Sequence, residues 1–416
     1  MKLSNYIKDI ATLSSGTLVS QIVLIVSIPF ISRIYSPLVF GSAAFIVAIG
    51  SILSALSTFK YDLAILKPKN DKEGLQFFFG SIVLNIILTI LGLFFLVIVP
   101  IKSELYFNYT LCVIFLIFFN GLSLSFTAWF NRNKQYRFIS IARIIKNLSL
   151  SFFTIFFGIF LSPDSIYIII ANIIGIFSFS LFCLIIFLNH YRKSIENFDL
   201  MEIFFLLRKN LDFPKYTLPA SIINIMTSQS PIIFLKIFFG EAIAGIYALV
   251  NRVMGAPSQL IAGATGEVYR QKASKEYNTN GNCYDLFIKT FRGLFLIAII
   301  PFIVVITLGP YLFSIVFGVE WTQSGYLARY LSIFFLLRFC ISPLSYTLIV
   351  SNKQNYNFSW QLYLFINTTI SIIYGYFLDS YILSVISFSC VYSIMYVIYF
   401  REILHSAKGT LVNGKN

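Results

Sequence analysis

Twelve apolar stretches, each long enough to cross a bilayer, constrain this chain more than any other feature of its sequence. A bilayer crossing takes ~20 mainly apolar residues in a helix, and 58% of the 416 residues are hydrophobic while only 12% are charged. We predict spans near residues 11–32, 38–59, 76–100, 108–130, 138–160, 166–189, 214–236, 242–263, 289–309, 326–350, 358–377 and 381–400. The sequence therefore predicts an all-α polytopic membrane protein and excludes a secreted or soluble enzyme.

The basic residues fall mainly on one side of these spans. With the N-terminus placed inside, 25 of the 31 Lys and Arg are assigned to the cytoplasmic tails and loops, cations at the cytoplasmic ends of spans included, and three to the periplasmic loops. The other three, Arg252, Arg329 and Arg338, lie within spans. The positive-inside rule thus predicts that both termini are cytoplasmic. Topology and anionic membrane lipids account for the net charge of +14, so no nucleic-acid partner is expected.

A pattern near the N-terminus returns about half a chain length later. "RIYSPLVFGSAAFI" and "KIFFGEAIAGIYAL" share an aromatic residue, a small turn, a glycine (Gly41, Gly245) and an apolar helix. Six spans per half is an even number, so we expect two six-helix lobes related by a pseudo-two-fold axis along the membrane normal. The predicted parts are an N-terminal lobe at 1–190, a cytoplasmic amphipathic linker at 191–213, a C-terminal lobe at 214–405 and a cytoplasmic tail at 406–416.

Arg252 stands near the middle of the apolar stretch "GIYALVNRVMGAPSQLIAG". An arginine at the bilayer centre costs at least ~2.5 to 3.5 kcal/mol on insertion scales. Ala248, Gly255 and Gln259 share its helical face, and such a small and polar face suits a water-filled cavity. The alternative is that Arg252 bonds a backbone carbonyl or buried amide and only holds helices together.

Other polar residues within spans are candidates for the same cavity. Arg338 and Arg329 differ by ~180° around one helix, so we place Arg338 in the cavity and expect Arg329 to extend to the periplasmic surface. Gln21 on the first span and Asn224 and Ser228 on the seventh also suit a wet interior, although interhelical hydrogen bonds explain them nearly as well. For Arg338, a structural pair is the alternative.

Opposite charges also recur at the cytoplasmic ends of the second and eighth spans. Lys60 and Asp62 follow Gly41 at about the distance at which Glu267 and Arg270 follow Gly245. We expect cross-lobe ion pairs of these four residues to form a cytoplasmic gate; ordinary charges at headgroup level are the alternative. The five cysteines are read as core residues without a disulfide, and neither a metal site nor a catalytic residue is expected.

Four segments resemble one known family. They are "LSSGTLVSQIVLIVSIPFISRIYSPLVFG", "STFKYDLAILKP", "AWFNRNKQYRFISIARIIKN" and "DFPKYTLPASIINIMTSQSPIIFLKIFFGEAIAGIYALVNRVMGAPSQLIAGATGEVYRQKAS". Together they are similar to the polysaccharide repeat-unit (O-antigen) flippases of the multidrug/oligosaccharidyl-lipid/polysaccharide export (MOP) superfamily, from about residue 5 to residue 405.

The resemblance implies a transporter of the bacterial inner membrane rather than an enzyme. Its substrate would be an undecaprenyl-diphosphate-linked oligosaccharide of O-antigen or capsule type, moved to the periplasmic leaflet by alternating access. The polymerase and chain-length regulator of the same pathway would be its partners. No cofactor is implied, and coupling to protons or another ion stays open. The diphosphate oxygens would suit the guanidinium fork of Arg252.

Two rival functions follow from the same composition. A cation-coupled multidrug exporter of this superfamily would carry a carboxylate deep in a span, whereas the acids here lie at interfaces or in loops. A membrane polysaccharide polymerase would need a periplasmic catalytic loop or paired acids, and the loop expected near 310–325 offers only Glu320.

Overall fold

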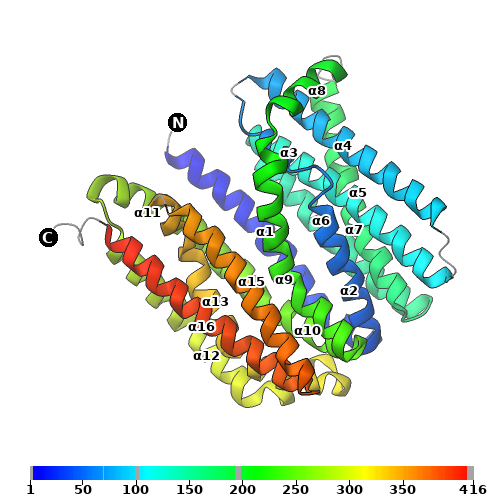
Figure 1. The fold of residues 1–416 in the computed structure, drawn as a ribbon, viewed down its shortest axis with the longest axis vertical. Helices are drawn as coiled ribbons and strands as arrows, with labels where there is room; N and C mark the ends of the chain where they lie inside the picture. The colour runs from blue at the N-terminus through cyan, green and yellow to red at the C-terminus, as the bar shows by residue number, and fades with distance from the viewer. Residues whose placement is uncertain (1–2, 69, 100–102, 193–197, 352, 410–416) are drawn as a thin grey trace. The chain divides into compact units, whose positions relative to one another are not determined.

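The computed structural model describes residues 3–68, 70–99, 103–192, 198–351 and 353–409. For residues 3–14, 259, 263–264, 267 and 354–355 it describes the backbone only. Within these ranges the chain is all helical, as predicted (Figure 1). Contacts between residues divide it into two compact units, 1–229 and 230–416. The division falls inside helix α9, and the predicted lobe boundaries stay a prediction.

The first unit is built from six long helices and two short ones. They are α1 (Leu3–Ile34), α2 (Pro37–Ser54), α3 (Tyr61–Ala64), α4 (Asp71–Ile98), α5 (Glu104–Arg132), α6 (Tyr136–Phe160), α7 (Ser165–Tyr191) and α8 (Leu200–Lys209). Polar side chains mark several starts: Asn70, Asp164 and Asp199 accept backbone N–H groups of the first turns of α4, α7 and α8. Helices α4 to α7 pack beside one another (Figure 1).

Helices α1 and α6 pack through small and polar residues. A Cβ at Gly16 would lie 2.2 Å from that of Ser140, so the two helices approach closely there. Asn147 Nδ2 donates to the carbonyl of Ser20 at 2.9 Å, and the hydroxyl of Ser151 donates to that of Ser27 at 3.0 Å. Small residues and interhelical hydrogen bonds are what hold spans together where lipid removes the hydrophobic driving force.

Helix α8 lies in the segment predicted as an amphipathic linker. Ile203 is buried, and Ile203 and Leu207 pack over Gly80 of α4. Glu202 pairs with Lys72 Nζ at 2.9 Å, and Tyr61 donates its hydroxyl to the carbonyl of Leu207 at 2.7 Å. The face turned away from these contacts is apolar and exposed; it carries Leu200, Met201, Phe204 and Phe205.

The second unit begins within α9 (Leu218–Phe239), a helix that starts after a π-helical turn at Phe213–Thr217. Its elements are α10 (Glu241–Pro257), a π-helical turn (Ser258–Ala262), α11 (Gly263–Asn280), α12 (Tyr284–Phe317), a 3-10 turn (Val319–Trp321), α13 (Thr322–Ile341), a 3-10 turn (Ser342–Tyr346), α14 (Thr347–Val350), α15 (Gln354–Phe377) and α16 (Tyr381–Lys408). Glycines allow α12 and α13 to approach, because a Cβ at Gly325 would lie 2.4 Å from the Cα of Pro310.

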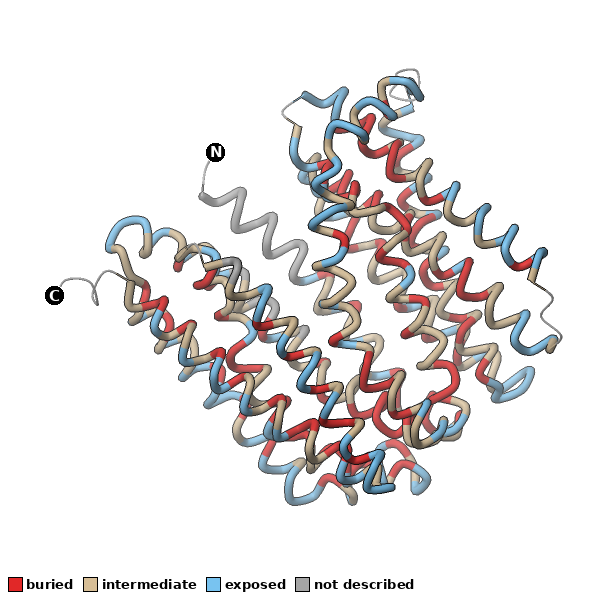
Figure 2. Tube along the Cα trace, viewed as in Figure 1, coloured by how far each residue is buried: buried red, intermediate tan, exposed pale blue. Residues whose placement is uncertain are grey.

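Within the described residues every predicted span lies largely on helix, and ten helical segments are long and apolar enough to cross a membrane. The spans predicted at 242–263 and 358–377 correspond to α10 and α15, which are not among the ten. Buried, intermediate and exposed residues alternate along the helices (Figure 2), as expected where each helix buries one face and presents the other.

Three boundaries in the prediction are wrong. The second span ends at Ser54 rather than 59, because turns follow it and Phe59 and Lys60 adopt positive φ angles of 47° and 64°. The span predicted at 326–350 is interrupted by the 3-10 turn that contains Pro343. The loop expected at 310–325 is mostly helical, since α12 runs on to Phe317.

Candidate functional site

Arg252 lies on α10, less than one turn after the buried run Ala244–Val250. The side chain is half-buried, and no hydrogen bond, ion pair or ring contact is recorded for it in the described chain. None of its nitrogens is among the buried side-chain atoms that lack a hydrogen-bond partner. One turn further, a Cβ at Gly255 would have only the side-chain oxygen of Asn251 within reach, at 4.0 Å. The guanidinium therefore has accessible space beside it.

The backbone changes from an α-helix to a π-helical turn shortly after this arginine. Helix α10 ends at Pro257, which has no N–H to continue the helical hydrogen bonds, and the wider π-helical turn Ser258–Ala262 follows. Single π-helical turns inside helices often mark functional sites. Gln259, predicted on the face of Arg252, lies in this turn, but its side chain is outside the described residues.

Arg338 lies on α13 among tyrosines that were not predicted near it from the sequence. It is half-buried and interacts electrostatically with the hydroxyls of Tyr247 on α10 and of Tyr392 and Tyr396 on α16. Tyr392 and Tyr396 are themselves buried and stacked, with ring centroids 5.2 Å apart. The surroundings of Arg338 are thus aromatic, whereas those of Arg252 are open.

Arg329 contacts the neighbouring helix α12, and its extension to the periplasmic surface stays a prediction. Its Nη2 donates to the backbone carbonyl of Thr307 on α12 at 2.9 Å, and its guanidinium lies over the ring of Tyr326 at 5.7 Å. This arginine therefore connects α13 to α12. Pro310 of α12 has no N–H, so it leaves the carbonyl of Ile306, the neighbour of Thr307, without its helical donor.

In the first unit, two cations of α6 lie within the predicted span 138–160, although the count of basic residues places them on the cytoplasmic side. Arg143 and Lys146 are 7 and 10 residues after the first residue of α6, or ~10 and ~15 Å along the helix. Arg143 Nη1 donates to the Thr17 hydroxyl of α1 at 2.7 Å. Gln21, the predicted cavity residue of α1, is half-buried one turn further on.

Asn224 and Ser228 of α9, the predicted cavity residues, make no recorded bond to another described helix. Asn224 and Ser228 are exposed, and the Ser228 hydroxyl donates to the carbonyl of Ile225 in its own helix. Ser221 does the same with Leu218. Their exposure is compatible with a wet interior, and their assignment to a cavity stays a prediction.

The four predicted gate residues have different surroundings. Asp62 is 4% exposed and accepts a hydrogen bond from the Thr58 hydroxyl at 2.5 Å. Lys60 is half-buried, and Arg270 is exposed, with its guanidinium 5.0 Å from the ring centroid of Tyr346. The side chain of Glu267 lies outside the described residues. Asp62 and Arg270 thus each have a partner within their own unit, and the gate stays a prediction.

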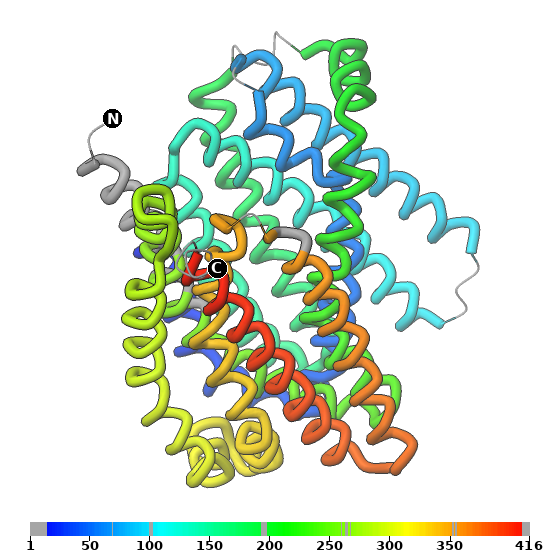
Figure 3. The backbone as a smooth tube through the Cα atoms, turned by 60° about the vertical axis from the view of Figure 1, so that its left-hand side comes forward, coloured from blue at the N-terminus to red at the C-terminus, as the bar shows by residue number. Residues whose placement is uncertain are grey.

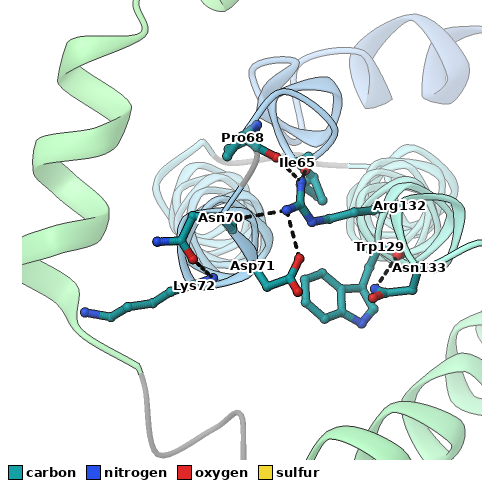
Figure 4. A network of polar contacts seen from close by, with 8 residues as sticks. All are labelled: Ile65, Pro68, Asn70, Asp71, Lys72, Trp129, Arg132 and Asn133. Atoms are coloured by element: carbon teal, nitrogen blue, oxygen red, sulfur yellow. Dashed lines mark hydrogen bonds and ion pairs between the residues drawn. The ribbon is translucent and has the colours of Figure 1, made fainter.

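The segment after Asp62 is fixed by an arginine that sequence reasoning missed. Figure 4 shows Arg132, at the end of α5, donating to the carbonyls of Ile65, Pro68 and Asn70 at 2.9, 2.7 and 3.0 Å. It also pairs with Asp71 at 3.0 Å, although the Asp71 side chain is 92% exposed. We call this set of contacts the Arg132 clamp; it connects α5 to the chain between α3 and α4.

Comparisons with known proteins agree with this architecture. A family model described as polysaccharide biosynthesis protein matches residues 6–269. The solved structure of the lipid II flippase MurJ in an inward closed conformation has a TM-score of 0.71 at 17% identity, with 95% of this chain and 87% of that chain covered. A comparison with curated proteins gave no match.

Two further solved structures have the same fold. A MOP superfamily transporter from Pyrococcus furiosus has a TM-score of 0.58 at 14% identity, covering 97% of each chain. A multidrug resistance MATE family transporter of the same superfamily, in an inward-facing conformation, has a TM-score of 0.55 at 14% identity, covering 96% of this chain and 95% of that one. At these identities the likeness shows the fold alone.

Proposed function

Because the chain belongs to the polysaccharide biosynthesis protein family and has the fold of MOP superfamily transporters, we propose that it is a flippase for undecaprenyl-diphosphate-linked oligosaccharide repeat units. It would carry repeat units of O-antigen or capsule type from the cytoplasmic to the periplasmic leaflet of the inner membrane. The observation that carries the proposal is Arg252, a cation within an apolar helix with accessible space and no recorded protein partner.

The chemistry of such a substrate explains why an arginine is placed there. A diphosphate carries its charge on oxygens that water solvates in the cytoplasm, and moving an ion into a low-dielectric interior costs several kcal/mol, even after relaxation. A guanidinium offers five N–H donors in a planar fork that matches two phosphate oxygens and keeps its charge at any working pH. Arg252 would therefore replace part of the lost hydration while the headgroup crosses the membrane.

In this proposal alternating access moves the lipid-linked oligosaccharide across the membrane, and Arg252 provides the positive charge that binds its diphosphate. In this proposal the cavity opens to the cytoplasm to receive the diphosphate and then to the periplasm to release it, with Lys60, Asp62, Glu267 and Arg270 closing the cytoplasmic side. Arg338, Gln21, Gln259, Asn224 and Ser228 would line the path of the oligosaccharide. No cofactor is needed, and proton or other ion coupling would set the direction of transport. The released unit would pass to the polymerase and chain-length regulator.

The same fold also occurs in transporters of another class of substrate. Multidrug transporters share it, so the fold does not choose between a drug and a lipid-linked sugar. In the described helices the acidic residues lie close to helix ends, for example Glu104 in the first turn of α5 and Glu402 near the end of α16. That placement favours an anionic substrate over a cation-coupled drug exporter, which needs a carboxylate deep in a span.

The proposal can be tested in proteoliposomes that contain the purified chain and a fluorescent undecaprenyl-diphosphate oligosaccharide. An impermeant reagent that destroys the fluorophore reports how much lipid has reached the outer leaflet. We expect the protein to move the lipid faster than liposomes with the same amount of inactive Arg252→Ala protein. Equal rates for the two proteins and for empty liposomes would rule out the proposed function, and movement of a cationic drug in place of the lipid would favour the exporter.

A further inference from the structure

A groove of ≈ 390 Å³ lies within the second unit, between α11 and the first turns of α12. Figure 3 shows the yellow-green chain leaving α11 and entering α12 there. The charged residues that line the groove are Lys272 and Glu276 of α11 and Asp285 and Lys289 of α12. Two cations and two anions therefore surround one space, and their formal charges cancel.

These charges do not neutralise one another directly. Lys272 and Glu276 are four residues apart on α11, and Asp285 and Lys289 are four apart on α12, a spacing at which opposite charges reach each other on a helix. The salt bridges recorded for the described residues nevertheless all lie elsewhere. The groove thus offers both signs of charge to a ligand that carries both.

An apolar stripe continues from the groove along α12. Gly293, Leu296, Ile300 and Ile303 follow Lys289 at intervals of 4, 7, 11 and 14 residues, so all four lie on its face of the helix. Leu296 and Ile300 are each 68% exposed and Ile303 is 50% exposed. A Cβ at Gly293 would meet no atom within 4 Å, so nothing in the described chain covers the passage from groove to stripe.

We propose that this groove binds one phospholipid with a phosphoethanolamine headgroup. Lys272 and Lys289 contact the phosphate, Glu276 and Asp285 accept hydrogen bonds from the primary ammonium, and the acyl chains lie along Leu296, Ile300 and Ile303. A phosphocholine group carries the same charges but has no N–H to donate. A phosphoglycerol headgroup has no cation, and it would leave both carboxylates beside a phosphate. The site is separate from Arg252 and does not depend on the proposed transport activity.

The test is native mass spectrometry of the detergent-purified full chain, incubated with equal amounts of phosphatidylethanolamine, phosphatidylcholine and phosphatidylglycerol of identical acyl chains. We expect about tenfold more phosphatidylethanolamine than phosphatidylcholine to be retained, as one net charged hydrogen bond would give. In the double variant Glu276→Gln with Asp285→Asn the preference should pass to phosphatidylglycerol. Lys272→Gln with Lys289→Gln should lose retention of all three lipids.

Lys275→Gln is the matched control, because Lys275 is an exposed cation of the same helix that does not line the groove. It should leave retention unchanged. Equal retention of the three lipids by the unaltered chain, or an unchanged preference in the acid-to-amide variant, would overturn the proposal. Soluble phosphoethanolamine separates a headgroup site from a lipid site: if it binds as tightly as the lipid, the acyl chains contribute nothing and the ligand is not a bilayer lipid.

Discussion

Two arginines, one in each unit, show two ways in which a membrane protein uses a guanidinium. Arg132 of the first unit donates to three backbone carbonyls and pairs with Asp71, and its side chain is only 10% exposed. Arg252 of the second unit has no recorded acceptor in the described chain and has accessible space beside it. Each arginine lies near the end of a helix that is followed by a turn. The two arginines therefore differ in the hydrogen-bond acceptors that lie within reach of the guanidinium.

The comparison teaches how to separate structural from functional cations. A buried polar group without a partner costs ~1 to 3 kcal/mol, and a charged one costs more. Arg132 and Arg329 reduce that cost by donating terminal N–H groups to backbone carbonyls, although the Nε of each is buried without a hydrogen-bond partner. Arg252 has no such carbonyl recorded, so water or a ligand must satisfy its donors. The absence of a partner, rather than depth in the membrane, therefore singles it out.

The largest effect is expected from removing Arg252. Arg252→Ala and Arg252→Gln should lower export of surface polysaccharide by about 100-fold or more, the equivalent of ~3 kcal/mol from a lost charged interaction. Arg252→Lys should keep part of the activity, because it keeps the charge but loses the fork. Membrane abundance should stay normal in all three variants. Surface polysaccharide and membrane abundance are measured together in the same cells.

A structural role of Arg252 predicts a different pattern. Neutral substitutions would then lower abundance and activity in proportion, as expected for an arginine that holds helices together. Full activity of Arg252→Ala at normal abundance would remove Arg252 from the proposed mechanism.

Removing Arg132 should act on stability instead of transport. Arg132→Met keeps the length of the side chain but leaves the carbonyls of Ile65, Pro68 and Asn70 without this donor. We expect the free energy of unfolding to fall by ~2 to 4 kcal/mol, seen as a lower midpoint of thermal unfolding in detergent. Export per folded molecule should stay near normal. A variant with normal thermal stability and no export would reverse the roles assigned to the two arginines.

Much of this architecture could be predicted from sequence, because a bilayer accepts only helices in this all-apolar pattern. Ten of the twelve predicted spans, the helix at Leu200–Lys209 and the family follow from hydropathy and short motifs. The Arg132 clamp could not be predicted, because its acceptors are backbone carbonyls of a turn. Every residue type has a backbone carbonyl, so the sequence does not show which carbonyls an arginine will reach. The tyrosines near Arg338 come from helices far apart in the chain. The surroundings of Arg143 could have been found, because it lies within a predicted span.

A smaller effect on stability is expected at Asp62, where the structural and gating roles can be separated. Asp62→Asn keeps an oxygen that accepts from Thr58, so abundance should change little, whereas Asp62→Ala leaves the buried Thr58 hydroxyl without this acceptor and should cost ~1 to 3 kcal/mol. If Asp62 also serves as a gate charge, Asp62→Asn should reduce export several-fold at normal abundance. Normal export by Asp62→Asn would remove Asp62 from the gate and leave it a structural residue.

The smallest effect is expected from Asp71, the acidic member of the Arg132 clamp. Its side chain is 92% exposed, and an ion pair so open to water contributes at most ~1 kcal/mol and is screened by salt. Asp71→Asn should therefore lower the free energy of unfolding by less than ~0.5 kcal/mol, and the small difference should vanish in high salt. Thermal unfolding of this variant beside Arg132→Met, at low and high salt, separates the two contributions to the clamp. A loss as large as that of Arg132→Met would mean that the ion pair, and not the three carbonyl bonds, fixes the segment after Asp62. Arg132 and Arg252 would then differ because Arg132 has a carboxylate partner, Asp71, and Arg252 has none recorded in the described chain. An ion pair, rather than backbone carbonyls, would decide which arginine can bind a ligand.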